Sequence, residues 1–224
     1  MNETAASLSS EAARDSTREA RSDTRQRLLD AAIEEFCTHG RQGASTARIV
    51  AAAQCNIRML YHYFGKKDGL YRAALLEVYT ELRDAEHRQD FWSGTPTEGV
   101  LRLVHFTFDY MHENRRFPRM ILAENLTGGT SVSDASEPYQ GSRALIENLD
   151  TLIARGYASG EFTEKPAAFD LYLTILALSF IHISNQHTLG STFGHSLGSA
   201  SFITNRRRHI AQVVLGYLCH TSQD

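Results

Sequence analysis

The residues between positions 41 and 67 combine positive charge with hydrogen-bonding and aromatic side chains, a chemistry suited to binding a polyanion. This segment holds three arginines, two lysines and no Asp or Glu, which gives a local charge of +5. Because the whole chain has a formal charge of -3, the remainder carries -8. A small basic module on an acidic body predicts a polyanion partner at one end. A solvated basic loop is the alternative that charge alone leaves open.

The composition is that of an ordinary globular protein: 224 residues, 42% hydrophobic and 22% charged. It excludes collagen-like chains, disulfide scaffolds and bulk disorder. Cys37, Cys55 and Cys219 are widely spaced, so they favour a reducing cytosol over a disulfide framework or a zinc pair. The longest apolar run, 171–183, is short of the roughly 20 residues that span a bilayer, and the N-terminus lacks the apolar core of a signal peptide. We therefore expect a cytoplasmic protein with no membrane partner.

Helical periodicity dominates the sequence. Residues 1–22 have almost nothing to bury and are predicted to form a flexible tail. From Thr24 to Gly40, apolar residues recur on one helical face, namely Leu28, Leu29, Ala32, Ile33 and Phe36. Ser45 and Asn56 stand at the N-cap positions of two short helices that follow, and the second ends at Tyr63 and Phe64.

Longer helices are expected beyond Gly65, at about 67–89, 97–113, 116–126, 139–159, 167–186 and 200–220. Polar segments rich in Gly and Ser, 127–137 and 188–199, are predicted to be mobile loops. No run alternates with the period of a strand. The sequence therefore predicts an all-α fold of about nine helices.

Residues 45–70 have the layout of a helix-turn-helix, in which Ile49, Val50, Ala53, Leu60 and either Ile57 or Cys55 hold two short helices together. The spacing Ser45-x-x-x-Ile49, then Ala53, then Asn56-x-x-x-Leu60-Tyr61-x-Tyr63-Phe64-x-x-Lys67-x-x-Leu70 resembles the DNA-binding domain of the tetracycline-repressor (TetR) family of bacterial regulators. The resemblance covers about residues 24–70. It implies a helix-turn-helix DNA-binding domain at 23–70, followed by a larger helical ligand-binding and dimerisation domain at 71–224.

The resemblance also implies a role for each matching position. The helix from Asn56 to Tyr63 would enter the major groove of double-stranded operator DNA. Arg58 would pair with a guanine and Met59 would touch a thymine methyl group, while Thr46 and Lys67 would bind phosphates. The complete set of DNA-binding candidates is Ser45, Thr46, Arg48, Asn56, Ile57, Arg58, Met59, Tyr61, His62, Tyr63 and Lys67.

Two positions depart from the family pattern, and some aromatic residues have a structural alternative. Gln54 stands where the family usually has the glycine of the turn, so it must adopt a left-handed conformation or the turn must change. Lys66 replaces a small capping residue, so the next helix is expected to begin without a side-chain cap. Core packing is the alternative role for Tyr61 or Tyr63. Core packing is the expected role of three further residues, Leu60, Phe64 and Leu70.

The second half of the chain has material for a dimer and for an effector pocket, the two features that the resemblance implies there. The run 171–183 is apolar on nearly every face, so a second subunit is expected to cover part of it. The last helix offers a companion face with Val213, Val214, Tyr217 and Leu218. The candidates for binding a small-molecule effector are Phe106, Tyr110, Glu124, Asn125 and His182.

The sequence also allows three other interpretations. The letters Gly194-His195-Ser196-Leu197-Gly198 match the nucleophile elbow of a serine hydrolase using Ser196, but no apolar strand precedes them and the required acid and histidine do not follow in order. The pairs His105 with His112 and His182 with His187 lack the spacing of a helical zinc site, so no metal or cofactor is expected. The third interpretation is a helical bundle that binds only other proteins. The favoured function is a ligand-responsive transcriptional repressor, not an enzyme, that binds a near-palindromic operator as a homodimer.

Overall fold

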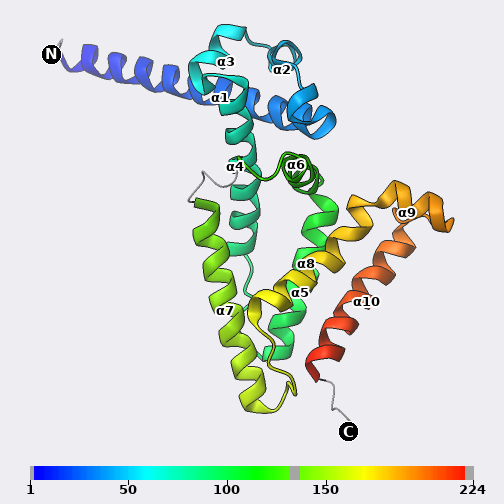
Figure 1. Cartoon of the computed structure of the whole chain (residues 1–224). Helices are drawn as coiled ribbons and strands as arrows, with labels where there is room; N and C mark the ends of the chain where they lie inside the picture. The colour runs from blue at the N-terminus through cyan, green and yellow to red at the C-terminus, as the bar shows by residue number, and fades with distance from the viewer. Residues whose placement is uncertain (1–2, 132–136, 220–224) are drawn as a thin grey trace. The chain divides into compact units, whose positions relative to one another are not determined.

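The computed structural model describes residues 3–131 and 137–219, and their regular structure is entirely helical. Ten helices occur in these two ranges, and no strand is found in them, as the periodicity predicts. The chain divides into two compact units (Figure 1). The first comprises Met1–Glu77 with Ala123–Val132, and the second comprises Val78–Leu122 with Ser133–Asp224.

The first unit contains α1 (Glu3–Gly43), α2 (Thr46–Ala52), α3 (Ile57–Phe64) and the start of α4 (Lys67–His87). All five apolar residues predicted on one face of the first helix are fully buried. They pack with Ile49 of α2, Leu60 of α3, and Leu70 and Tyr71 of α4, each of which is also 0% exposed. The Tyr71 ring meets Phe36 edge-on, with centroids 4.9 Å apart. This core fixes α2 and α3 against α1.

The first helix is longer than the sequence predicts. The structure continues α1 from Glu3 through the stretch for which a flexible tail is expected. Ala, Glu and Arg are strong helix formers, so local propensity continues the helix where there is no apolar face to bury. At the other end, Gly40 has φ 65° and interrupts the helical backbone, at the residue where the sequence predicts that the helix ends.

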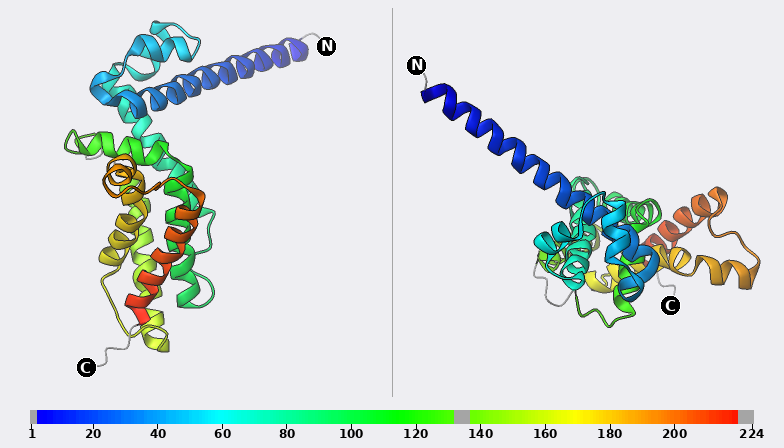
Figure 2. Two further views of the ribbon diagram at one scale, coloured as in Figure 1. Left: turned by 90° about the vertical axis from the view of Figure 1, so that its right-hand side faces the viewer. Right: turned by 90° about the horizontal axis from the view of Figure 1, so that it is seen from above.

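The second unit is a bundle built on four long helices. These are α5 (Pro96–Glu113), α7 (Glu137–Ser159), α8 (Ala168–Ser184) and α10 (Ala200–Cys219), and they run alongside one another in Figures 1 and 2. Two shorter helices, α6 (Arg116–Asn125) and α9 (Gln186–Phe193), complete the order. The core includes Leu103 and Phe108 of α5, Leu149 of α7, Ile175 of α8 and Ile210 of α10.

Helix α8 buries one side and leaves apolar side chains exposed on another. Leu171 and Ile175 lie in the core, whereas Phe169, Leu173 and Ile181 are 61%, 51% and 43% exposed. The exposed residues recur mainly at four-residue spacing, which keeps them near one face of the helix. The sequence predicts an apolar helix that needs a second covering element, and this arrangement fits that prediction.

The companion face on α10 needs a correction. Val213 and Tyr217 are exposed, but Val214 and Leu218 are 1% and 0% exposed and belong to the core of their own unit. One residue along a helix turns by about 100°, so neighbouring positions cannot share a face. Only Val213 and Tyr217 are therefore available to a partner.

The segment 188–199 also differs from its prediction. Instead of a loop throughout, residues up to Phe193 form α9, and Gly194 ends that helix in the left-handed conformation at φ 67°. Within the described ranges, no single helix is long and apolar enough to cross a membrane. Helices α8 and α9 meet such a criterion only as a pair bent by 72°.

Candidate DNA-binding site

Both short helices begin at the capping residues that the sequence predicts. The Ser45 side chain accepts a hydrogen bond from the backbone N–H of Arg48 at the start of α2. The Asn56 Oδ1 accepts one from the N–H of Met59, at 3.1 Å, at the start of α3. These caps satisfy amide groups that a helix leaves without partners in its first turn. They fix where the second helix of the pair begins, and hence which side chains it presents.

The turn between the two helices contains Gln54 in a left-handed conformation. Its φ is 52°, the only positive value at a non-glycine position in the part of the chain that the structure describes. The sequence leaves open whether Gln54 adopts this conformation or the turn is altered, and the structure shows the first. The Gln54 side chain is exposed, so it brings no packing that offsets the backbone strain.

We predict that Gln54→Gly stabilises the first unit. Glycine removes the left-handed strain but increases the entropy of the unfolded chain, so the net gain in unfolding free energy should be roughly 0.5 to 1 kcal/mol. Urea denaturation followed by circular dichroism measures it. Gln54→Ala keeps the Cβ atom and should bring no comparable gain, and an equal gain from both variants would show that strain is not the cause.

Helix α3 presents one face to the core and another to solvent. Leu60 is 0% exposed, whereas Ile57 and Tyr61 are 38% and 52% exposed, and Arg58 and His62 are exposed as well. The outward position of Ile57 excludes it as the residue that joins the two helices. Cys55, the alternative, is partly buried. The face that bears Arg58 and Tyr61 is thus free of core packing, which favours a contact role for Tyr61 over its structural alternative.

The two other aromatic residues of α3 are partly buried. Tyr63 lies edge-on to His62, with centroids 5.1 Å apart, and to Phe64, 6.2 Å apart. The guanidinium carbon of Arg25 lies 5.4 Å from the centre of the Phe64 ring. Leu60 and Leu70 are core residues as predicted, while Phe64 is only half-buried beneath a cation.

Two of the predicted DNA-binding cations, Arg48 and Lys67, are engaged within their own unit. The Arg48 Nε donates to both carboxylate oxygens of Glu35, at 2.9 and 3.1 Å, and a terminal nitrogen donates to the Gly43 carbonyl at 2.9 Å. The hydrogen bond from Arg48 lowers the pKa of Glu35. The Lys67 Nζ donates to the Gln42 carbonyl at 3.1 Å. These contacts tie α2 and α4 to the end of α1.

The predicted effector-binding residues do not come together. Glu124 belongs to the first unit, where its carboxylate accepts a hydrogen bond from the N–H of Ser131 at 2.6 Å. Burial and the nearby Glu124 carboxylate raise the pKa of Tyr71. Asn125 is the last residue of α6 and is exposed. Phe106 and Tyr110 pack in the second unit with ring centroids 5.7 Å apart, and only His182 lines one of the two cavities described below.

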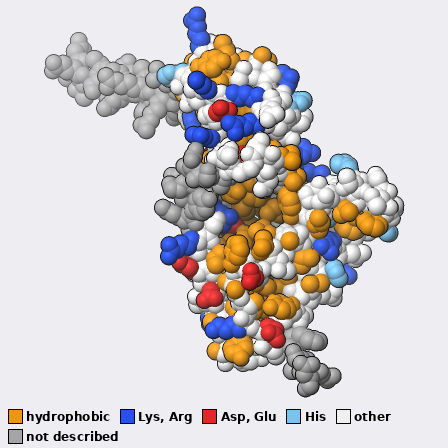
Figure 3. Space-filling model, viewed as in Figure 1, with side chains coloured by type: hydrophobic (Ala, Val, Ile, Leu, Met, Phe, Trp, Pro, Cys, Tyr) orange, Lys and Arg blue, Asp and Glu red, His pale blue; other side chains and the backbone are white. Residues whose placement is uncertain are grey.

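The sequence does not single out most of the residues that line the cavities of the second unit, because no short motif marks them. A cavity of about 450 Å³ in the second unit is lined from α4 through α8, and Figure 3 shows hydrophobic side chains gathered around a hollow there. Its lining residues include Tyr79, Leu82, Met111, Phe117, Ile146, Tyr172 and Leu176. One lining cation, Arg83, forms an ion pair with Glu86 at 2.6 Å, and both side chains are largely buried.

Ser196 is not placed for nucleophilic catalysis of the hydrolase type. A nucleophile elbow needs a strand before the serine and a helix after it. Here the preceding element is α9, which ends at Phe193, and the exposed Ser196 lies in the turn that leads to α10. The five matching letters therefore stand in the wrong structural setting.

An N-terminal helix-turn-helix on a helical second unit defines a class, that of DNA-binding transcriptional regulators. Residues 28–74 match the model of the family described as "Bacterial regulatory proteins, tetR family". Residues 96–214 match that described as "Tetracyclin repressor-like, C-terminal domain". The second match alone covers about half of the chain.

Curated relatives agree with both matches. The chain is 30% identical to the HTH-type transcriptional repressor NicS of Pseudomonas putida, over 75% of this chain and 79% of the relative. It is 40% identical to the HTH-type transcriptional repressor SCO4008 of Streptomyces coelicolor, over 70% and 76%. The crystal structure of the putative transcriptional regulator SCO4942 from Streptomyces coelicolor shares the fold, with a TM-score of 0.66 and 23% identity over 88% of this chain and 99% of that one. The chain belongs to the TetR family of transcriptional regulators.

Proposed function

We propose that this regulator is a repressor that binds a near-palindromic operator as a homodimer and is released by a small-molecule effector. The observation that carries the proposal is the outer face of α3, where Arg58, Tyr61 and His62 are exposed above a fully buried Leu60. A helix with such a face fits the major groove, where base edges can be distinguished. Lys and Arg side chains gather over this unit in Figure 3, which suits the phosphate backbone.

We propose different roles for the candidate residues. Arg58 and Met59 are proposed to read bases, and Ile57 to pack against the groove wall. Thr46, Tyr61, His62 and Tyr63 are proposed to contact phosphate or sugar groups. Arg48 is proposed to position α2 through Glu35, because its guanidinium already has two acceptors within the protein. Ser45 and Asn56 act as caps, and Lys67 at the start of α4 is proposed to bind a further phosphate.

The exposed apolar faces of α8 and α10 support the proposed homodimer. Phe169, Leu173 and Ile181 on one helix, with Val213 and Tyr217 on the other, give a surface suited to a two-fold four-helix interface. A dimer also presents two reading helices to two half-sites, which a near-palindrome requires. The proposed location is the cytoplasm, where a bacterial regulator meets DNA.

We expect Tyr217→Asp to convert the dimer into a monomer. A carboxylate placed in a buried apolar interface has no partner there, so the dimer dissociation constant should rise by about 100-fold or more. Sedimentation equilibrium measures it. Tyr157→Asp is a matched control, because Tyr157 is also 52% exposed but lies on α7. If both variants remain dimers, α10 does not form the interface.

The cavity lined from α4 through α8 is the proposed effector site. Its one lining arginine, Arg83, is paired with Glu86, so the site has little net charge to offer. Burial raises the pKa of Glu86 to about 7, and Arg83 opposes that shift, so the pair is neutral above this pH and becomes positive below it. An apolar, uncharged effector that stacks on Phe117 or Tyr172 fits this lining best. Its binding would favour a dimer whose reading helices are wrongly spaced for the operator.

A reporter assay tests repression directly. A promoter carrying the bound DNA fragment should be silenced when the wild-type chain is expressed and active when Arg58→Ala is expressed. An increase in reporter output with the wild-type chain would show that the regulator is an activator.

A further inference from the structure

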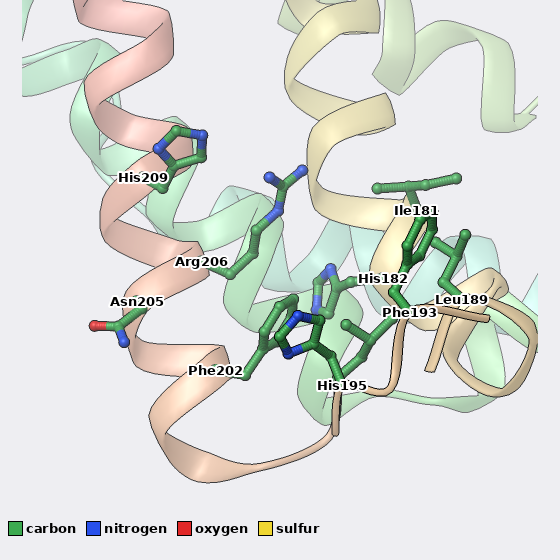
Figure 4. Close-up of a pocket in the computed structure, with 10 residues that line it drawn as sticks. Ile181, His182, Leu189, Phe193, His195, Phe202, Asn205, Arg206 and His209 are labelled. Carbon is green, nitrogen blue, oxygen red and sulfur yellow. The ribbon is translucent and has the colours of Figure 1, made fainter. Parts of the chain in front are cut away.

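A second cavity in the second unit is separate from the proposed effector site. Its volume is about 510 Å³, and it is lined from the end of α8, from α9 and the turn after it, and from α10 (Figure 4). The lining residues are distinct from those of the effector cavity. The apolar part of its wall consists of Ile181, Leu189, Phe193, Leu197 and Phe202. A helix predicted as a loop therefore contributes part of this wall.

His182 lies against this cavity with unused hydrogen-bonding capacity. His182 is 3% exposed, and neither of its ring nitrogens has a hydrogen-bond partner among the residues that the structure describes. The ring stacks on Phe108 with centroids 4.9 Å apart. Burial, with Arg206 next in effect, lowers the pKa of His182 to about 4. The ring is therefore neutral at pH 7, with one donor and one acceptor. Buried polar groups without a partner are uncommon in folded proteins.

Arg206 supplies a positive charge beside this histidine. One terminal nitrogen donates to the Leu178 carbonyl at 3.1 Å, and no carboxylate pairs with this guanidinium within the described ranges. The next residue, Arg207, is paired with Asp109 at 2.7 and 2.8 Å. No Asp or Glu lines the cavity. Arg206 is thus a partly buried cation whose charge is not neutralised locally, unlike Arg83 in the effector cavity.

We propose that this cavity binds an amphipathic carboxylate, with its carboxylate on Arg206 and His182 and its apolar body against Phe193 and Phe202. Guanidinium groups bind carboxylates through paired, charge-assisted hydrogen bonds, and a neutral imidazole can donate a further one. Figure 4 shows the side chains of His182, Phe202 and Arg206 directed into the same space from α8 and α10. This site goes beyond the proposed function, which needs only the effector cavity.

The cavity lies on α8 and α10, the two helices proposed to form the dimer. The competing occupant of the cavity is therefore a carboxylate side chain of a second copy of the chain. The local chemistry favours a small molecule, because the cavity, with a volume of about 510 Å³, places an apolar wall beside a cation and has no acidic lining residue. The two occupants give different results when binding and oligomeric state are measured on the same variants.

Isothermal titration calorimetry of the full chain with octanoate tests the proposal, with 1-octanol as the uncharged probe of equal length. Octanoate should bind, and Arg206→Gln should weaken its binding at least tenfold. Arg208→Gln is the matched control, because Arg208 is exposed on the same helix and lines neither cavity. It should leave octanoate binding unchanged, and 1-octanol binding should be equal in all three proteins. His182→Phe keeps the stacking ring and should also weaken octanoate binding.

Three results would overturn the proposal. The first is an octanoate affinity no higher than that for 1-octanol. The second is an equal loss in Arg206→Gln and Arg208→Gln. The third is an Arg206→Gln variant whose oligomeric state changes in sedimentation while octanoate fails to bind the wild-type chain, which would assign the cavity to the subunit interface. None of these measurements uses DNA, so failure here leaves the proposed regulator function intact.

Discussion

Replacing Arg58 with alanine should abolish most specific operator binding while leaving the fold unchanged. Arg58 is exposed at the start of α3, and no ion pair within the described residues holds its guanidinium. Loss of a bidentate base contact costs about 1 to 3 kcal/mol, and a dimer loses it at two half-sites, so the total should be about 2 to 6 kcal/mol. Fluorescence anisotropy on an operator duplex at fixed salt measures the loss.

Two control variants separate base recognition by Arg58 from the effect of its positive charge. Arg119→Ala removes an exposed arginine from the second unit and should leave operator affinity unchanged. Arg58→Lys keeps the charge but not the planar fork, so it should retain non-specific binding and lose discrimination between operator and unrelated DNA. If Arg58→Ala binds the operator as tightly as the wild-type chain, α3 does not read the major groove in the way proposed.

The second large effect is on stability. Leu60 lies on α3 close to the exposed reading residues, yet it is 0% exposed and fills the core between α1 and α2. Leu60→Ala should lower the unfolding free energy by about 2 to 5 kcal/mol, since it removes buried methyl groups and leaves a cavity. Urea denaturation of the full chain, monitored by circular dichroism, measures this change.

Ile57→Ala is the matched comparison on the same helix. Because Ile57 is 38% exposed, the cost should be below about 1 kcal/mol. Equal destabilisation by the two variants would mean that α3 is rotated relative to the arrangement described here. The pair therefore tests which face of α3 is available to DNA, without any DNA in the experiment.

Local signals in the sequence predicted the two short helices of the first unit, but not the extension of α1 through the segment expected to be a flexible tail. Ser45 and Asn56 cap their helices as expected, because capping depends on the residue and its immediate neighbours. At Gln54 the sequence left two alternatives open, a left-handed residue or an altered turn, and only the structure shows the left-handed one. What the sequence did not predict was the engagement of Arg48 by Glu35, since the partner lies thirteen residues away on another helix.

In the second unit, the sequence predicted most of the helices but not how their side chains pack. Helix positions followed from periodicity, but α9 was missed because Gly190 and several polar residues made its segment resemble a loop. The candidates Phe106, Tyr110, Glu124 and Asn125 line neither cavity, because pocket lining depends on how helices pack rather than on residue type. Val214 and Leu218 were assigned to a partner surface for the same reason, since the sequence does not say which stripe of an apolar helix faces its own core.

The central claim is that the first unit reads a specific DNA sequence. The most direct measurement is selection of genomic DNA fragments by the purified full chain at two salt concentrations, followed by sequencing of the retained fragments. We expect one inverted repeat to be enriched at both concentrations, with half-sites about one helical turn, roughly 34 Å, or a multiple of it apart. Retention that shows no sequence preference and disappears at the higher salt would contradict the claim. It would mean that the basic surface binds DNA phosphates without recognising a sequence.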